Sequence, residues 1–123
     1  MQFNLERPDY QYFLRGANGE AALVNERRIA RSFVIAPDAL VEDWQLQDVR
    51  AMTPADLDTL FAQHPELIVL GTGASQVFPP AIVMAACLQR GIGIEVMSNA
   101  AAARTYSVLA GEGRRVVAGF VFA

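Results

Sequence analysis

The chain predicts an α/β fold: a three-layer single domain over residues 1–123, with a mixed central sheet and an antiparallel β portion at the N-terminal side. Three observations predict it. The first half holds short β-type runs separated by glycine and asparagine turns, which is typical of antiparallel hairpins. The second half alternates helical and strand patterns, which favours parallel pairing with helices packed over the sheet. With 123 residues, of which 53% are hydrophobic, one domain can build a core of its own.

The N-terminal half predicts an antiparallel meander. Its turns are the Gly/Asn-rich stretch 16–19, the polar stretch 25–28 and the Pro-Asp pair at 37–38. Residues 40–44 form either one more short strand or a loop that crosses the sheet. The strands expected between these turns cover residues 10–15, 21–24 and 29–36.

The first helix is predicted to begin at Thr53. Thr53 can cap the helix, Pro54 suits the first helical position, and the carboxylate of Asp56 interacts favourably with the positive end of the helix dipole. The helix ends at His64-Pro65, where a histidine cation would meet the negative end of the dipole. The apolar stripe of this helix would be Leu57, Leu60 and Phe61.

The remaining elements alternate strand and helix. Residues 67–70 form a continuous apolar run, as in a strand that is buried on both faces. Pro79-Pro80 opens a second helix that Gly91 ends, and Ser98-Asn99 caps a third helix over 100–110. Further strands are expected over 92–97 and 116–122. The inner side of the second helix is predicted to hold Ile82, Val83, Ala86 and Cys87.

Composition excludes several classes of function. A formal charge of −3 and a pI near 5 argue against nucleic-acid binding, which needs a basic face. One cysteine and one histidine give neither a disulfide nor a standard zinc site, so no cofactor or metal is expected. No apolar run reaches the ~20 residues of a membrane helix, and residues 1–10 lack a signal-peptide core. We expect a cytoplasmic chain without direct membrane insertion, peripheral to the inner membrane if a partner holds it there.

The first candidate site follows the strand at 67–70. Its residues are Gly71, Thr72, Gly73, Ser75 and Gln76. The glycines would let a ligand approach backbone N–H groups at a helix start, and the polar side chains would supply hydrogen bonds. The turn has no Gly-Lys-Ser/Thr, and Gln76 stands where a dinucleotide-binding motif has its third glycine, so nucleotide binding is disfavoured. The alternative is that both glycines only permit positive φ angles.

The second candidate site is the start of the third helix, with Asn99, Arg104, Thr105 and Tyr106. If the two preceding strands are neighbours, both helix starts open on one edge of the sheet, where ligand crevices of α/β folds lie. Arg104 would then bind an anion or a carboxylate. The alternatives are that Asn99 is a plain cap and that Arg104 pairs with Glu95, which could itself be a general base or an exposed edge residue.

Two stretches carry a family resemblance. The first is residues 67–73 with Gln76 and Pro79 after them, and the second is residues 91–97 followed by 102–106. Together they resemble the family of mitochondrial respiratory complex I assembly factor three and its small bacterial and archaeal relatives. The resemblance covers the chain from about Phe33 onward.

The resemblance implies a three-layer α/β fold with a mixed sheet and no established catalytic activity. Mitochondrial members act as assembly partners at the inner membrane, and bacterial members often lie in genes beside protein-export components. Two positions depart from the family pattern: Ser107 stands where an asparagine is common, and Ala103 stands where some relatives have cysteine.

The residues and the resemblance together favour a small non-catalytic partner-binding or assembly-type protein, and the resemblance implies a link to respiratory-complex or membrane-protein biogenesis. The alternative is an enzyme or a small-anion or carboxylate-binding protein that uses the crevice at 71–78 and 99–106. A protein partner is expected in the first case. A homo-oligomer formed through the exposed edge of the β-meander is a third hypothesis.

Overall fold

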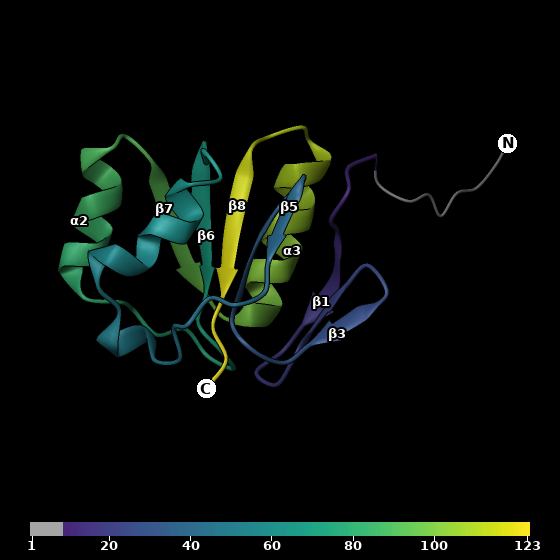
Figure 1. Ribbon diagram of the computed structural model, residues 1–123, viewed down its shortest axis with the longest axis horizontal. Helices are drawn as coiled ribbons and strands as arrows, with labels where there is room; N and C mark the ends of the chain where they lie inside the picture. Colours follow the sequence, from purple (N-terminus) through teal and green to yellow (C-terminus); the bar gives the residue numbers. More distant parts are fainter. Residues whose placement is uncertain (1–8) are drawn as a thin grey trace, which may run out of the picture.

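The computed structural model describes residues 9–123. Within these residues, five short strands come first, two 3-10 turns and three helices follow, and three longer strands are interleaved with the helices (Figure 1). The strands are β1 (Leu14–Ala17), β2 (Ala22–Val24), β3 (Arg27–Ile29), β4 (Phe33–Ala36), β5 (Ala39–Val41), β6 (Leu67–Gly71), β7 (Gly93–Met97) and β8 (Val116–Phe120). The 3-10 turns are η1 (Val49–Ala51) and η2 (Pro54–Leu57), and the helices are α1 (Asp58–Phe61), α2 (Ala81–Gln89) and α3 (Asn99–Gly111).

The strands form two sheets. The smaller has the order β1-β2-β3 and is antiparallel throughout. The larger has the order β5-β4-β8-β6-β7, in which β6 is parallel to both β7 and β8, while β4 is antiparallel to β5 and β8. The α/β class, the mixed central sheet and the antiparallel N-terminal portion are confirmed.

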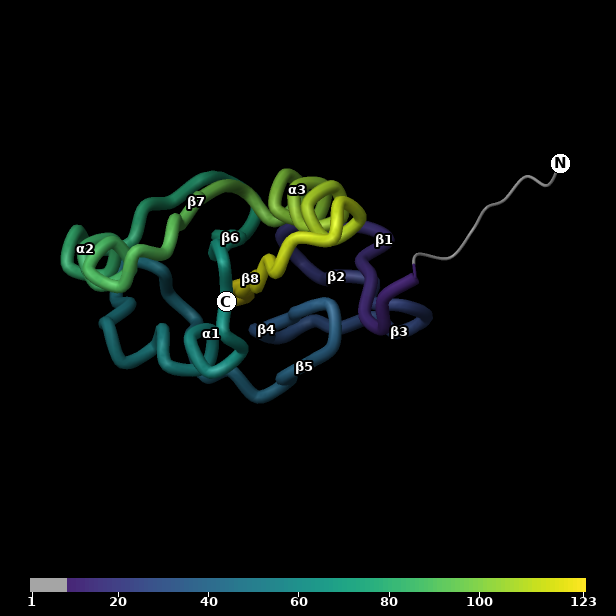
Figure 2. Tube along the Cα trace, turned by 90° about the horizontal axis from the view of Figure 1, so that it is seen from above, coloured from purple at the N-terminus to yellow at the C-terminus, as the bar shows by residue number. Residues whose placement is uncertain are grey.

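The large sheet separates two hydrophobic cores. Leu67 and Val69 of β6 face one core, whereas Ile68 and Leu70 face the other, as the period of two residues along a strand requires. α3 and the small sheet cover the first face, and α1, α2 and the segment before them cover the second (Figure 2). The molecule therefore has three layers.

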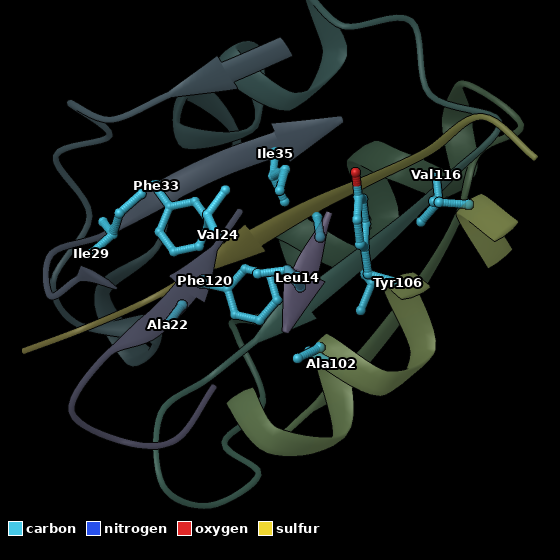
Figure 3. Packing of buried hydrophobic residues seen from close by; sticks show 14 of the residues in the cluster. Leu14, Ala22, Val24, Ile29, Phe33, Ile35, Ala102, Tyr106, Val116 and Phe120 are labelled. Carbon is cyan, nitrogen blue, oxygen red and sulfur yellow. The ribbon is translucent and has the colours of Figure 1, made fainter. Parts of the chain in front are cut away.

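The first core is built around aromatic rings. Phe33 stacks on Phe120 with ring centroids 5.1 Å apart, and it also faces Phe122. Tyr106 of α3 enters the same core from the helical side, between the two sheets (Figure 3). α3 is therefore fixed by both sheets.

The predicted single strand over 29–36 is wrong: β3 ends at Ile29 in the small sheet and β4 begins at Phe33 in the large one. Buried Ser32 explains the break, because its hydroxyl accepts from the backbone N–H of Phe122 at 2.9 Å. That bond also fits the end of β8 at Phe120 instead of 122. Arg27 and Arg28, predicted in a turn, belong to β3.

The helix start at Thr53 is confirmed. Its backbone N–H donates to Asp56 Oδ2 at 2.8 Å, which is half of a capping box. The first turn is 3-10, and the α-helical part covers only Asp58–Phe61. His64 ends the segment with a left-handed φ of 57°. Among residues 9–123, no helix is both long and apolar enough to cross a membrane.

Candidate functional site

The two strand-to-helix corners lie side by side, as predicted. β6 and β7 are parallel neighbours, and Gly71 at the end of β6 pairs with Met97 at the end of β7. The backbone N–H of Thr72 donates to the Met97 carbonyl at 2.9 Å, and the N–H of Asn99 donates to the Gly73 carbonyl at 2.8 Å. Parallel pairing brings the carboxyl ends of both strands to one edge of the sheet.

Asn99 is the centre of this corner. Its side chain is fully buried. Oδ1 accepts from the N–H of Gly73 at 3.0 Å, while Nδ2 donates to the carbonyls of Asn18 at 3.1 Å and Val121 at 3.3 Å. Both amide hydrogens are thereby used. Asn99 therefore does more than cap α3: it ties the β1–β2 loop, the Gly71 turn and the end of β8 together.

The polar side chains of the Gly71 turn are also bonded internally. The hydroxyl of Thr72 donates to the Ser75 carbonyl at 2.6 Å and accepts from the N–H of Val77 at 3.0 Å. Gln76 Nε2 donates to the Val96 carbonyl at 2.9 Å, which fastens the turn to β7. The turn is thus held by its own side chains, whereas Ser75 is exposed to solvent.

The two glycines of this turn, Gly71 and Gly73, are required for different physical reasons. Gly73 has a φ of 104°, which a residue with a side chain rarely adopts. Gly71 does not have a positive φ; a Cβ there would lie 2.5 Å from Oδ1 of Asn99. The positive-φ interpretation therefore holds for Gly73, and Gly71 is required by close packing.

The predicted residues of α3 separate into core and surface. Thr105 donates to the sulfur of Met97 at 3.3 Å. Tyr106 is completely buried and donates to the Tyr12 carbonyl at 2.8 Å; burial raises the pKa of its phenol far above the ordinary value. Arg104 is exposed. In the described part of the chain it forms no ion pair with Glu95, which lies exposed on the edge strand β7.

Two grooves flank these residues. One, of about 430 Å³, adjoins the Gly71 turn on the β8 side. The other, of about 500 Å³, lies between β1 and α3 and includes Arg104. Arg104 therefore lines a groove distinct from the one at the Gly71 turn. The groove beside the Gly71 turn is lined by Gly19, Gln47, Asp48, Val49, Arg50, Thr72, Gly73, Ala74, Val77, Val121 and Ala123.

Other reactive groups are scarce in the described residues. From 9 to 123, no three His, Cys, Asp or Glu side chains gather as metal ligands would. Cys87 is fully buried in α2, and burial raises the pKa of its thiol, which opposes formation of a nucleophilic thiolate. Every buried side-chain nitrogen or oxygen in this part of the chain has a hydrogen-bond partner. The corner therefore offers packing and hydrogen bonding more than chemistry.

The outer side of α2 was missed by the sequence analysis. Ile82, predicted on the inner side of this helix, is 63% exposed, and Leu88 is 69% exposed. Phe78, just before the helix, is 60% exposed. The signal was present in the sequence, because α2 holds no charged residue at all. We call Phe78, Ala81, Ile82, Ala85 and Leu88 the α2 surface.

Known proteins match nearly the whole chain. Residues 15–121 match the family described as a protein of unknown function (DUF498/DUF598). The chain belongs to this family. The DUF498 family includes mitochondrial respiratory complex I assembly factor three and bacterial relatives, so the resemblance found in the sequence is confirmed.

Two solved structures share the fold, and a third protein is similar in sequence. A Xanthomonas campestris protein determined by NMR is 52% identical, with 98% of this chain and 92% of that chain covered and a TM-score of 0.84. A Bordetella parapertussis crystal structure is 30% identical, with coverages of 95% and 100% and a TM-score of 0.82. A Francisella tularensis protein named "13 kDa major membrane protein" is 31% identical over 72 residues, which is 58% of either chain.

Proposed function

We propose that this DUF498 protein is a non-catalytic partner-binding protein that contacts another protein through the α2 surface. The observation that carries the proposal is the apolar character of α2 on both sides. Val83 and Cys87 pack into the second core, while Ile82 and Leu88 face solvent. A helix that is hydrophobic all round is normally covered on all sides. The uncovered side therefore marks a contact surface.

The helical period gathers these side chains on one side of α2. Ala81, Ala85 and Leu88 are spaced i, i+4, i+7, so they form one stripe, and Ile82 lies beside it. The two alanines are small, so a partner can approach the helix closely between the larger side chains. An exposed apolar helix side of this kind suits a helix or sheet face of another protein.

The polar corner supports a non-catalytic role. Thr72, Gln76 and Asn99 all direct their polar groups to backbone atoms of the same chain. General acid or base catalysis needs a titratable group that can reach a substrate. The fully buried Tyr106, whose hydroxyl is bonded to the Tyr12 carbonyl, does not meet that need.

The relatives suggest where the partner resides. The Francisella relative carries the name of a membrane protein, and the family includes a respiratory complex assembly factor. The chain itself has no membrane-spanning helix among residues 9–123. We therefore propose that its partner is a membrane protein or a subunit in assembly, and that the chain is peripheral to the membrane through that partner.

The alternative is a small-anion site at the groove beside the Gly71 turn. Arg50 lines that groove, and the N–H of Gly73 would have suited an anion. Two observations weaken this alternative: the Gly73 N–H already donates to Asn99 Oδ1, and the acidic residue Asp48 is among the residues that line the same groove. The proposed docking role of the α2 surface does not depend on the Gly73 N–H or on Arg50.

Site-specific photo-crosslinking in the native cells tests the proposal. A photoreactive residue is placed at Leu88 on the α2 surface or, as a control, at exposed Glu26 in the β2–β3 turn. We expect one protein adduct from position 88, absent from position 26 and reduced when Ile82→Gln is added. An adduct formed equally at both positions, or formed only with lipid or with a second copy of the chain, would contradict the proposal.

A further inference from the structure

We infer that the groove between β1 and α3 binds a small carboxylate that carries an apolar body, such as a medium-chain alkanoate. This inference does not depend on the α2 surface. The groove has a volume of about 500 Å³, which lies within the range of small-molecule sites. It is lined by Leu14, Arg15, Gly16, Ala17, Ala100, Ala103, Arg104, Ser107 and Val108.

The helical wall of the groove follows from spacing along α3. Ala100, Arg104 and Ser107 are spaced i, i+4, i+7 and therefore share one side of the helix. The opposite wall is β1, where Gly16 and Ala17 leave open space, and a Cβ at Gly16 would meet nothing within 4 Å. Because the residues on both walls are small, their side chains leave the space between helix and strand unfilled.

The charged residues that line the groove between β1 and α3 are all positive. Arg15 and Arg104 line it, and no Asp or Glu is among its lining residues. The guanidinium of Arg15 is bonded to Glu26 at 2.9 Å and to the Asn25 carbonyl at 2.9 Å. Arg104 has no ion pair within residues 9–123. Its guanidinium is therefore available to donate two parallel hydrogen bonds to the oxygens of a carboxylate.

The remaining lining demands an apolar body on the ligand. Leu14 and Ala103 are buried beneath the groove, Ala100 lies on its wall, and Val108 stands at its rim. The hydroxyl of Ser107 donates to the Leu14 carbonyl at 3.3 Å, which reduces its availability to a ligand. An inorganic anion would meet Arg104 and leave these walls in contact with water. A hydrocarbon chain of several carbons would cover them.

NMR titration of the full chain with octanoate, below its micelle concentration, tests the inference. We expect saturable shifts of the amides of Gly16, Ala100 and Arg104. Acetate, which has the charge without the hydrocarbon, and 1-octanol, which has the hydrocarbon without the charge, should bind at least about tenfold more weakly, because each lacks one of the two contacts.

Two variants and a matched control complete the test. Arg104→Gln should weaken octanoate binding about tenfold, and Ala100→Leu should abolish it by filling the groove. Arg50→Gln, an exposed arginine at the other groove, should leave it unchanged. Unchanged binding in Arg104→Gln, equal binding of 1-octanol, or weaker binding in Arg50→Gln would overturn the inference. Arg104→Gln changes an exposed side chain, so it remains decisive if Ala100→Leu fails to fold.

Discussion

Helices α2 and α3 cover opposite faces of the same sheet but meet very different surroundings. α3 packs on β1, β6 and β8, and its buried residues belong to the core shared by the two sheets. α2 contacts β7 and η2 on one side, while its other side exposes Ile82 and Leu88. The fold accounts for the apolar residues of α3 that lie in the core. The fold gives no reason for the apolar residues on the outside of α2. A contact with another molecule explains them best.

The difference between the two helices predicts that substitutions on α3 affect the stability of the fold, whereas substitutions on the α2 surface affect binding. Substitutions in the buried part of α3 should lower the free energy of unfolding, because they create cavities or leave polar groups without partners. Substitutions on the α2 surface should change contacts with other molecules and leave the free energy of unfolding nearly unchanged. Four predictions test this separation.

The largest loss is expected from Tyr106→Ala. Removing a fully buried ring from between the two sheets should lower the free energy of unfolding by about 4 kcal/mol. Urea unfolding measures it. Val108→Ala, on the same helix but 58% exposed, is the control and should change the value by less than about 0.5 kcal/mol. Equal losses from the two variants would show that burial on α3 is not what stabilises it.

Asn99→Ala should be the next most damaging change. It removes the partner of the Gly73 N–H and of the Asn18 and Val121 carbonyls. We expect a loss of about 2–3 kcal/mol, together with faster hydrogen exchange at Gly73. Ser98→Ala, which removes the hydroxyl that caps Ala101, should cost about 1 kcal/mol. A smaller loss from Asn99→Ala than from Ser98→Ala would mean that the corner is not held by the amide.

Tyr106 also predicts a loss of stability at alkaline pH. Burial raises its pKa in the folded state above the unfolded value near 10, so the unfolded chain loses this proton first. The contribution is fully present below pH 10 and is lost as pH rises above 10, by about 1.4 kcal/mol per pH unit. Tyr106→Phe should remove this part of the decline when unfolding is measured between pH 9 and pH 11. An identical decline in both proteins would assign it to other groups.

The smallest effect on stability is expected from changing the α2 surface. The double variant Ile82→Gln and Leu88→Gln replaces two exposed side chains, so the free energy of unfolding should change by less than about 0.5 kcal/mol. Binding of a hydrophobic dye and formation of the partner adduct should both fall. A loss of several kcal/mol would mean that the outside of α2 is needed for folding, which would remove the contrast with α3.

The sequence predicted most elements because their signals are local. The capping box at Thr53, the apolar run of β6 and the proline pair before α2 each lie within a few residues. The failures were non-local. Ile29 and Phe33 continue one β-type pattern, and the break between them depends on Ser32 meeting Phe122, which lies 90 residues away. Ile82 has the hydrophobicity of a core residue, and its exposure is set by where α2 sits over β7.

The candidate site divides in the same way. The sequence by itself determined that there are two strand-to-helix corners, which contain glycine, threonine and asparagine. This was possible because the signals for strand ends and helix caps lie in neighbouring residues. Only the tertiary structure decided how their polar groups are used. The bonds from Asn99 to Asn18 and Val121 join segments separated by 81 and 22 residues. Such long-range hydrogen bonds form because the fold brings the segments together in space. The spacing of the residues along the chain does not reveal that proximity.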